Sequence, residues 1–120
     1  MANAVKIAKM DEEKRKKEMS KMIGKLLKDK EEKQLKTLEE MITDMREATD
    51  EEYINLCSTN MGIAATMPEE QLKGFMALRM KANSKLPDDI KSRDMKMINE
   101  AMGKVPEDMR TKLSAAMPKN

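Results

Sequence analysis

The stretch "LPDDIKSRDM" at residues 86–95 has the features of a helix start, because two acidic residues follow a proline directly. Proline suits the first helical turn, where its missing N–H is not needed, and acids there meet the positive end of the helix dipole. The same arrangement occurs in "MPEEQLKGFM" at 67–76 and "VPEDMRTKLS" at 105–114. The three prolines are spaced 19 residues apart, which predicts a regular series of helices.

The same interval continues toward the N-terminus without proline. One step back gives "TDEE" at 49–52, where Thr49 is a suitable N-cap. The next step gives "KEE" at 30–32, with Asp29 as the expected cap, and the last gives "DEE" at 11–13. Helix starts are therefore predicted at positions 11, 30, 49, 68, 87 and 106.

Apolar residues keep this interval as well. Positions 8, 12 and 15 residues after a start lie on one face of a helix. These positions hold Met19, Leu38, Cys57, Met76 and Met95, then Ile23, Ile42, Met61 and Met80, then Leu26, Met45, Ala64 and Met102. Ser114, Asn99 and Asn83 interrupt the pattern. Each unit should thus be a helix of about four turns with one apolar stripe.

These patterns predict an all-α fold, a compact or lightly curved bundle of about six short antiparallel helices. Period-2 alternation is missing, and methionine, a good helix former, accounts for 15 of the 120 residues. The domain should span 11–117, after a leader at 1–10 that is partly disordered or begins the first helix, and before a tail at 118–120. Residues 49–67, which carry no Lys or Arg, and the next unit, which adds Leu72, Phe75 and Leu78, should be central, whereas the first unit should lie at an edge.

Two alternatives to this bundle stay open. One is an α-solenoid of three helix hairpins with a 38-residue repeat. The other fuses the first two helices into one, from about residue 9 to residue 47, because "KDKEEKQ" at 28–34 lacks glycine and proline.

Composition disfavours several classes of function. The 24 basic and 22 acidic residues nearly cancel, aromatic residues are scarce, and histidine is absent, which argues against nucleic-acid binding and histidine-based catalysis. Cys57 is the single cysteine, and we expect a buried structural thiol; Tyr53 should pack its ring and expose its hydroxyl to water. No cofactor or metal is expected, although pairs such as Met76 and Met80 have a spacing that could converge on Cu(I). Without a secretory signal or an 18-residue apolar run, a cytoplasmic location is expected.

The methionine content suggests a function in binding. Most methionines fall in the repeating positions and should fill the core, but a methionine-rich groove could hold varied apolar partners. We therefore expect a non-enzymatic interaction module (an adaptor, a small regulatory subunit or a chaperone-like protein) that binds a protein partner or an apolar ligand, or associates with itself. The candidate partner-binding residues are Leu35, Leu38, Met41, Ile42, Met45, Met97 and Met109.

Two other functions stay open. The run "KRKK" at 14–17 could bind an anionic partner, either nucleic acid or a membrane surface, although flanking acids favour a solvated face. An enzyme component that uses carboxylates and lysines is the remaining alternative. Neither nucleic acid nor membrane is the expected partner.

Overall fold

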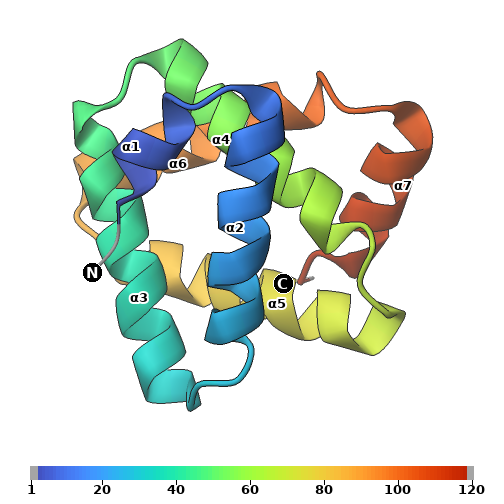
Figure 1. Cartoon of the computed structure of the whole chain (residues 1–120). Helices are drawn as coiled ribbons and strands as arrows, with labels where there is room; N and C mark the ends of the chain where they lie inside the picture. Colours follow the sequence, from blue (N-terminus) through green and yellow to red (C-terminus); the bar gives the residue numbers. More distant parts are fainter. Residues whose placement is uncertain (1–2, 119–120) are drawn as a thin grey trace.

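The computed structural model describes residues 3–118, and this part of the chain consists of helices joined by short turns, without a strand (Figure 1). The predicted all-α class is confirmed. The helices are α1 (Ala4–Ala8), α2 (Glu12–Leu26), α3 (Glu31–Asp44), the 3-10 turn η1 (Met45–Glu47), α4 (Asp50–Ala64), α5 (Glu69–Ser84), α6 (Asp88–Met102) and α7 (Glu107–Ala116). The principal extents, 32 × 31 × 27 Å, are those of a compact bundle and not of an elongated solenoid.

The six predicted helix starts are confirmed, since the N-caps are residues 11, 30, 49, 68, 87 and 106. Thr49 forms a capping box in which its hydroxyl accepts from the Glu52 backbone N–H and the Glu52 carboxylate accepts from the Thr49 N–H. The cap expected at Asp29 was wrong. Lys30 occupies that position and makes no side-chain cap hydrogen bond. The turn at 27–30 separates α2 from α3, so a fused helix does not form.

The short helix α1 was not predicted. Residues 4–8 form a helix separate from α2, because Lys9 to Asp11 form a turn between the two helices. Ala4, Ile7 and Ala8 of α1 are buried, and the Val5 N–H donates to Asp44 Oδ2 at 3.2 Å. Tertiary packing stabilises α1, because five residues are too few to form a stable helix alone. Residues 1–2 of the leader and 119–120 of the tail lie outside the described part.

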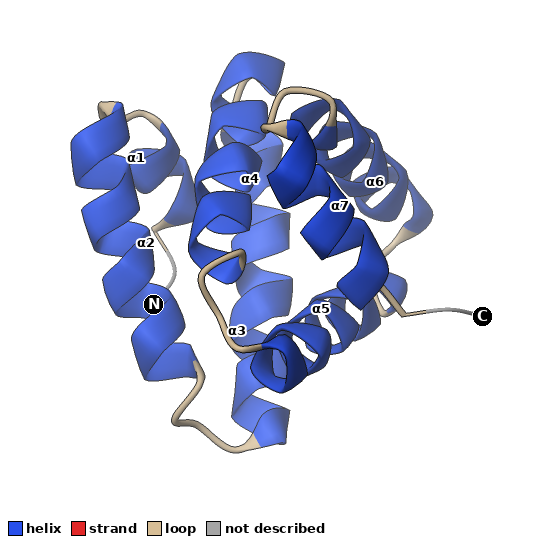
Figure 2. Cartoon of the chain, turned by 90° about the vertical axis from the view of Figure 1, so that its right-hand side faces the viewer, coloured by secondary structure: helices blue, strands red, loops and turns tan. Residues whose placement is uncertain are grey.

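Alternate helices, rather than consecutive ones, form the main packing contacts. α2 packs on α4, α3 on α5, α4 on α6 and α5 on α7, so the chain is not a stack of hairpins. α4 lies between α2 and α6, which confirms the central place predicted for residues 49–67 (Figure 2). α2 and α3 run in opposite directions but diverge, because each presents its apolar stripe to a different partner (Figure 1).

Methionines divide into two groups by burial. Met19, Met45, Met67 and Met97 are buried, whereas the other described methionines are half-buried. The expectation that most would fill the core is therefore only partly met, and half-buried thioether side chains remain accessible around the bundle centre. Within residues 3–118, no helix combines the length and the apolar character needed to cross a membrane.

Candidate binding site: a methionine-lined cleft beside a buried ion pair

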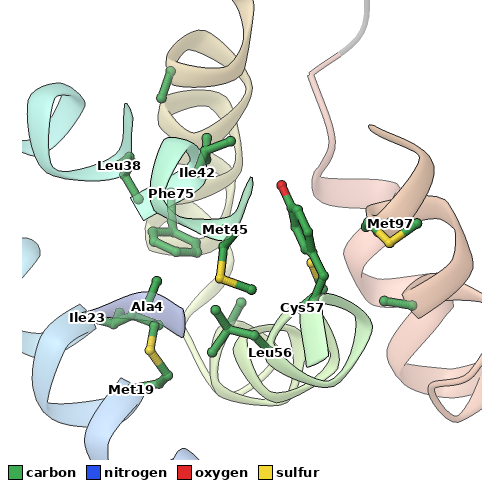
Figure 3. Close-up of a cluster of buried hydrophobic side chains, with 14 of the residues drawn as sticks. Ala4, Met19, Ile23, Leu38, Ile42, Met45, Leu56, Cys57, Phe75 and Met97 are labelled. Carbon is green, nitrogen blue, oxygen red and sulfur yellow. The ribbon is translucent and has the colours of Figure 1, made fainter. Parts of the chain in front are cut away.

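An apolar cleft of about 110 Å³ lies at the centre of the bundle. Its walls come from α2, α3, η1, α4, α5, α6 and α7, together with Met117. Figure 3 shows side chains of α3, α4 and α5 converging there, with Met45 beside Leu56. Eight methionines contribute to the lining, namely Met19, Met22, Met41, Met45, Met61, Met76, Met80 and Met117.

The divergence of α2 and α3 explains why a cleft exists at this place. Both helices contact α1, which bridges them, but they are not one of the closely packed helix pairs in the described chain. Met22 of α2 and Met41 of α3 both line the cleft and are only half-buried. Met61, Met76 and Met80 are half-buried as well. The lining is therefore accessible to solvent along several helices.

The structure brings four of the seven candidate residues together at this cleft. Leu38, Met41, Ile42 and Met45 line it. The other three do not line it, since Leu35 and Met97 are buried outside the lining and Met109 is half-buried on α7.

Met97 was proposed as a partner-binding residue because it stands outside the predicted stripe, but it is only 1% exposed. Its neighbour Ile98 is half-buried and lines the cleft, whereas Asn99, at a predicted stripe position, is exposed. The apolar face of α6 is thus rotated from the predicted one, and Met97 is not available to a partner in this structure.

A buried polar cluster adjoins the cleft and centres on Asp94 of α6, which is 0% exposed. Arg79 of α5 donates from Nη1 to Oδ2 (2.9 Å) and from Nη2 to Oδ1 (2.7 Å). The Tyr53 hydroxyl donates to Oδ1 (2.5 Å), and Asn83 Nδ2 donates to Oδ2 (2.8 Å). The prediction that Tyr53 exposes its hydroxyl to water was therefore wrong, since Asp94 needs that donor to offset its burial.

The electrostatics of this cluster favour the charged ion pair. Burial alone raises the pKa of Asp94, but the hydrogen bonds and charge of Arg79 outweigh burial, and the pKa falls below its ordinary value. For Arg79, burial lowers the pKa, while its bonds to Asp94 and the charge of Asp94 outweigh that effect and raise it. Burial, followed by the charge of Asp94, raises the pKa of Tyr53. None of these groups is poised to exchange a proton near pH 7.

Cys57 lies in the cleft wall and is buried, in agreement with the expected structural thiol. Burial is the main cause that raises the pKa of this thiol to about 12, while the nearby Arg79 charge lowers it and the Asp94 charge raises it. The thiol therefore keeps its proton at neutral pH and is a poor nucleophile.

Asn60 of α4 is a polar residue among those around the cleft. Its Oδ1 is buried and has no hydrogen-bond partner, and it is the one such side-chain atom within the described residues. The flanking Cys57 and Met61 also line the cleft. A buried acceptor left unpaired costs about 1–3 kcal/mol, so this oxygen lowers the stability of the fold locally.

A signal for both Asp94 and Arg79 was present in the sequence and was not used. Seven residues after the last four helix starts, Asp94 shares its position with Leu56, Phe75 and Leu113, whereas the first two units have Glu18 and Thr37 there. Eleven residues after a start, Arg79 shares its position with the apolar cleft residues Met22, Met41, Ile98 and Met117. An acid and a base that each replace an apolar residue in a repeating inward position predict a buried ion pair.

Residues 3–118 contain no group of three or more His, Cys, Asp or Glu side chains arranged to hold a metal ion. Comparison of the chain with protein-family models, with curated proteins and with solved structures found no match.

Proposed function

We propose that this protein is a non-enzymatic binding module that holds an apolar ligand, or an apolar side chain of a protein partner, in the methionine-lined cleft. The observation that carries the proposal is the half-exposed lining itself, in which Met22, Met41, Met61, Met76 and Met80 come from four different helices. Methionine is flexible and polarizable, so such a wall adapts to ligands of different shape. Binding sites of this kind are mostly apolar with a few placed polar groups.

The chemistry of the cleft supports binding rather than catalysis. Cys57 and Tyr53 keep their protons, and the charge of Arg79 is matched by Asp94. A catalytic site commonly holds groups whose pKa values are tuned toward the working pH, and these groups are shifted away from it.

Nuclear magnetic resonance of isotope-labelled methionine methyl groups tests the proposal, with toluene as the apolar probe. We expect the methyl signals of Met22, Met41, Met61, Met76 and Met80 to shift in a saturable way. The signals of Met95, Met102 and Met109 serve as internal references, because these residues lie outside the cleft lining.

A pair of matched variants tests whether the cleft is the place of binding. Met41→Trp should fill the cleft and weaken toluene binding at least tenfold, whereas Met109→Trp should leave it unchanged. Both replaced residues are half-buried helical methionines, but only Met41 lines the cleft. If the cleft methyl groups do not respond to toluene, or if both variants bind it equally well, the proposed function is wrong.

A second candidate function is the binding of an anionic partner by α2. Lys14, Lys17, Lys21 and Lys25 are all exposed, and their spacing of three or four residues places them along one helix face. Arg15 does not join them, because it is buried and donates from Nε to Thr59 Oγ1 (2.7 Å) and from Nη1 to Met10 O (2.8 Å). The one ion pair on this face joins Lys21 to Glu18 at 3.8 Å.

This candidate is tested with an oligonucleotide and with vesicles that contain an anionic lipid. Binding should weaken steeply as salt is raised and should be lost when Lys17, Lys21 and Lys25 are replaced by Gln. Replacement of Lys81, Lys85 and Lys104, which are exposed on other elements, is the matched control. Equal binding by the two triple variants would exclude α2 as the contact surface.

A further inference from the structure

The residues Met76 and Met80 of α5 have the spacing of a soft-metal ligand pair, and the apolar binding proposed above does not depend on their sulfur atoms. They are four residues apart on one helix, and both are half-buried and line the cleft. Residues at this spacing share a helix face, with Cβ atoms about 5–6 Å apart. The Met side chain is long and flexible, so both thioethers can turn toward one ion.

A third thioether is available on the helix that packs against α5. Helices α3 and α5 are one of the closely packed pairs, and Figure 1 shows α3 crossing α5. Met41 of α3 lines the same cleft and is half-buried like the two methionines of α5. Two neighbouring helices therefore supply three neutral sulfur donors to one cleft wall.

The chemistry of the lining selects a soft metal ion. Carboxylate and carbonyl oxygens suit Mg²⁺ and Ca²⁺, and imidazole suits Zn²⁺ and Cu²⁺. Among residues 3–118, the lining contains neither Asp nor Glu, and the chain has no histidine. Thioether sulfur is a soft ligand that favours Cu(I). The donor set thus matches Cu(I) better than a harder ion.

The charges near the cleft favour an ion with a single charge. Arg79 is the cationic side chain of the lining, and it donates to both oxygens of Asp94 at 2.9 and 2.7 Å, which balances its charge. The thioethers are neutral, so the charge of a bound ion is not offset by its ligands. Because the cost of removing an ion from water rises with its charge, a monovalent ion is favoured over a divalent one.

We infer that Met41, Met76 and Met80 form a thioether site for Cu(I) in the wall of the cleft. This site adds an ion-binding function to the apolar binding proposed above and does not depend on it. The metal is supplied and held as Cu(I), so no electron transfer takes place. Thioethers carry no proton to release when a metal binds, so Cu(I) affinity should be the same at pH 6 and pH 8.

Competition with a Cu(I)-specific chelator, in anaerobic solution with ascorbate, tests the site. We expect the wild-type chain to retain one equivalent of Cu(I). Met76→Leu/Met80→Leu should bind Cu(I) more weakly by roughly tenfold or more, because leucine keeps the apolar volume and lacks the sulfur. Met95→Leu/Met109→Leu is the matched control and should bind as the wild type does, since these half-buried methionines lie outside the lining.

Two further variants sharpen the assignment. Met41→Leu should also weaken Cu(I) binding, since it removes the third sulfur. Cys57 is the competing sulfur ligand, because it belongs to the same lining. Cys57→Ser should retain Cu(I), whereas loss of Cu(I) in this variant, or binding that weakens steeply from pH 8 to pH 6, would overturn the thioether assignment. The same conclusion follows if the wild type retains no Cu(I) or if the two double variants bind it equally.

Toluene binding by the same proteins separates this inference from the proposed function. Met76→Leu/Met80→Leu should still bind toluene, because its cleft wall stays apolar. If the wild type retains Cu(I) and does not bind toluene, the proposed function fails and the metal site stands. If the wild type binds toluene and not Cu(I), the metal site is overturned alone. Met80→Leu repeats the test with a smaller change in packing and should also weaken Cu(I) binding.

Discussion

Arg79 of α5 and Asp94 of α6 are 15 residues apart in the chain and form a bidentate ion pair at the centre of the bundle, with N–O distances of 2.9 and 2.7 Å. Asp94 also accepts from Tyr53 of α4, so one carboxylate joins three helices. Such a pair is costly to break, because removal of one partner leaves a charge without compensation away from water.

Asp94→Asn should therefore lower the free energy of unfolding by about 3 kcal/mol at pH 7. The matched control is Asp50→Asn, which removes the other Arg–Asp ion pair of the described chain, with Arg93 at 3.0 Å. The Asp50 side chain is 64% exposed, and its loss should cost below about 1 kcal/mol. Urea unfolding followed by circular dichroism measures both. Similar losses in the two variants would contradict a special role for the buried pair.

The Asp94 carboxylate should make the free energy of unfolding depend on pH. The pKa of Asp94 is lower in the folded chain than its ordinary value, so its contribution is present above the unfolded pKa of about 3.9. That contribution is lost as the pH falls through about 4 toward the folded pKa. Urea midpoints measured from pH 6 to pH 3 should fall for the wild type and fall less steeply for Asp94→Asn. Parallel curves for the two proteins would refute this assignment.

Cys57 should be almost inert in the native protein. Burial raises the pKa of its thiol to about 12, so the thiolate fraction is roughly a thousandfold below that of a thiol with a pKa of 9. A thiol-specific disulfide reagent at pH 8 should label the native chain very slowly and the urea-unfolded chain rapidly. Native labelling as fast as unfolded labelling would show that the thiol reaches solvent.

The missing cap of α3 offers a way to stabilise the protein. Lys30 holds the N-cap position without a side-chain hydrogen bond, whereas Asp11 and Thr49 provide one at the corresponding positions. Lys30→Ser should raise the free energy of unfolding by about 1 kcal/mol, because the serine hydroxyl can accept from a backbone N–H in the first turn. Lys28→Ser, an exposed change in the same turn, is the control and should have little effect. A gain of equal size at both positions would rule out capping as the cause.

The helix boundaries were predictable because their causes are local. A proline or a capping side chain followed by acids acts within one helical turn. The regular interval of 19 residues strengthens the prediction of each helix start. Thr49 and Pro87 were read correctly on this basis. The cap at Asp29 was misassigned by one residue, since an acidic side chain was preferred over the lysine that keeps the interval.

The features that depend on distant packing were not predictable in the same way. Helix α1 has no local stabilising signal; it contacts α2, α3 and α4, and its Ile7 is buried. Which helices pack together depends on how the apolar face of each helix fits against the others. The short turns between consecutive helices do not determine this packing. The cleft follows from that pairing, so several of the candidate residues line it, but Met97 is buried outside its lining.

Oxidation of the methionine side chains can change the polarity of the cleft lining. Each accessible methionine takes up one oxygen atom from an oxidant such as peroxide and becomes a polar, chiral sulfoxide, and reductases can reverse the reaction. The half-exposed residues Met22, Met41, Met61, Met76 and Met80 are open to this chemistry, whereas the fully enclosed Met19 is shielded. Oxidation would make this lining polar, so the apolar binding proposed for the cleft would depend on the redox state of the surroundings.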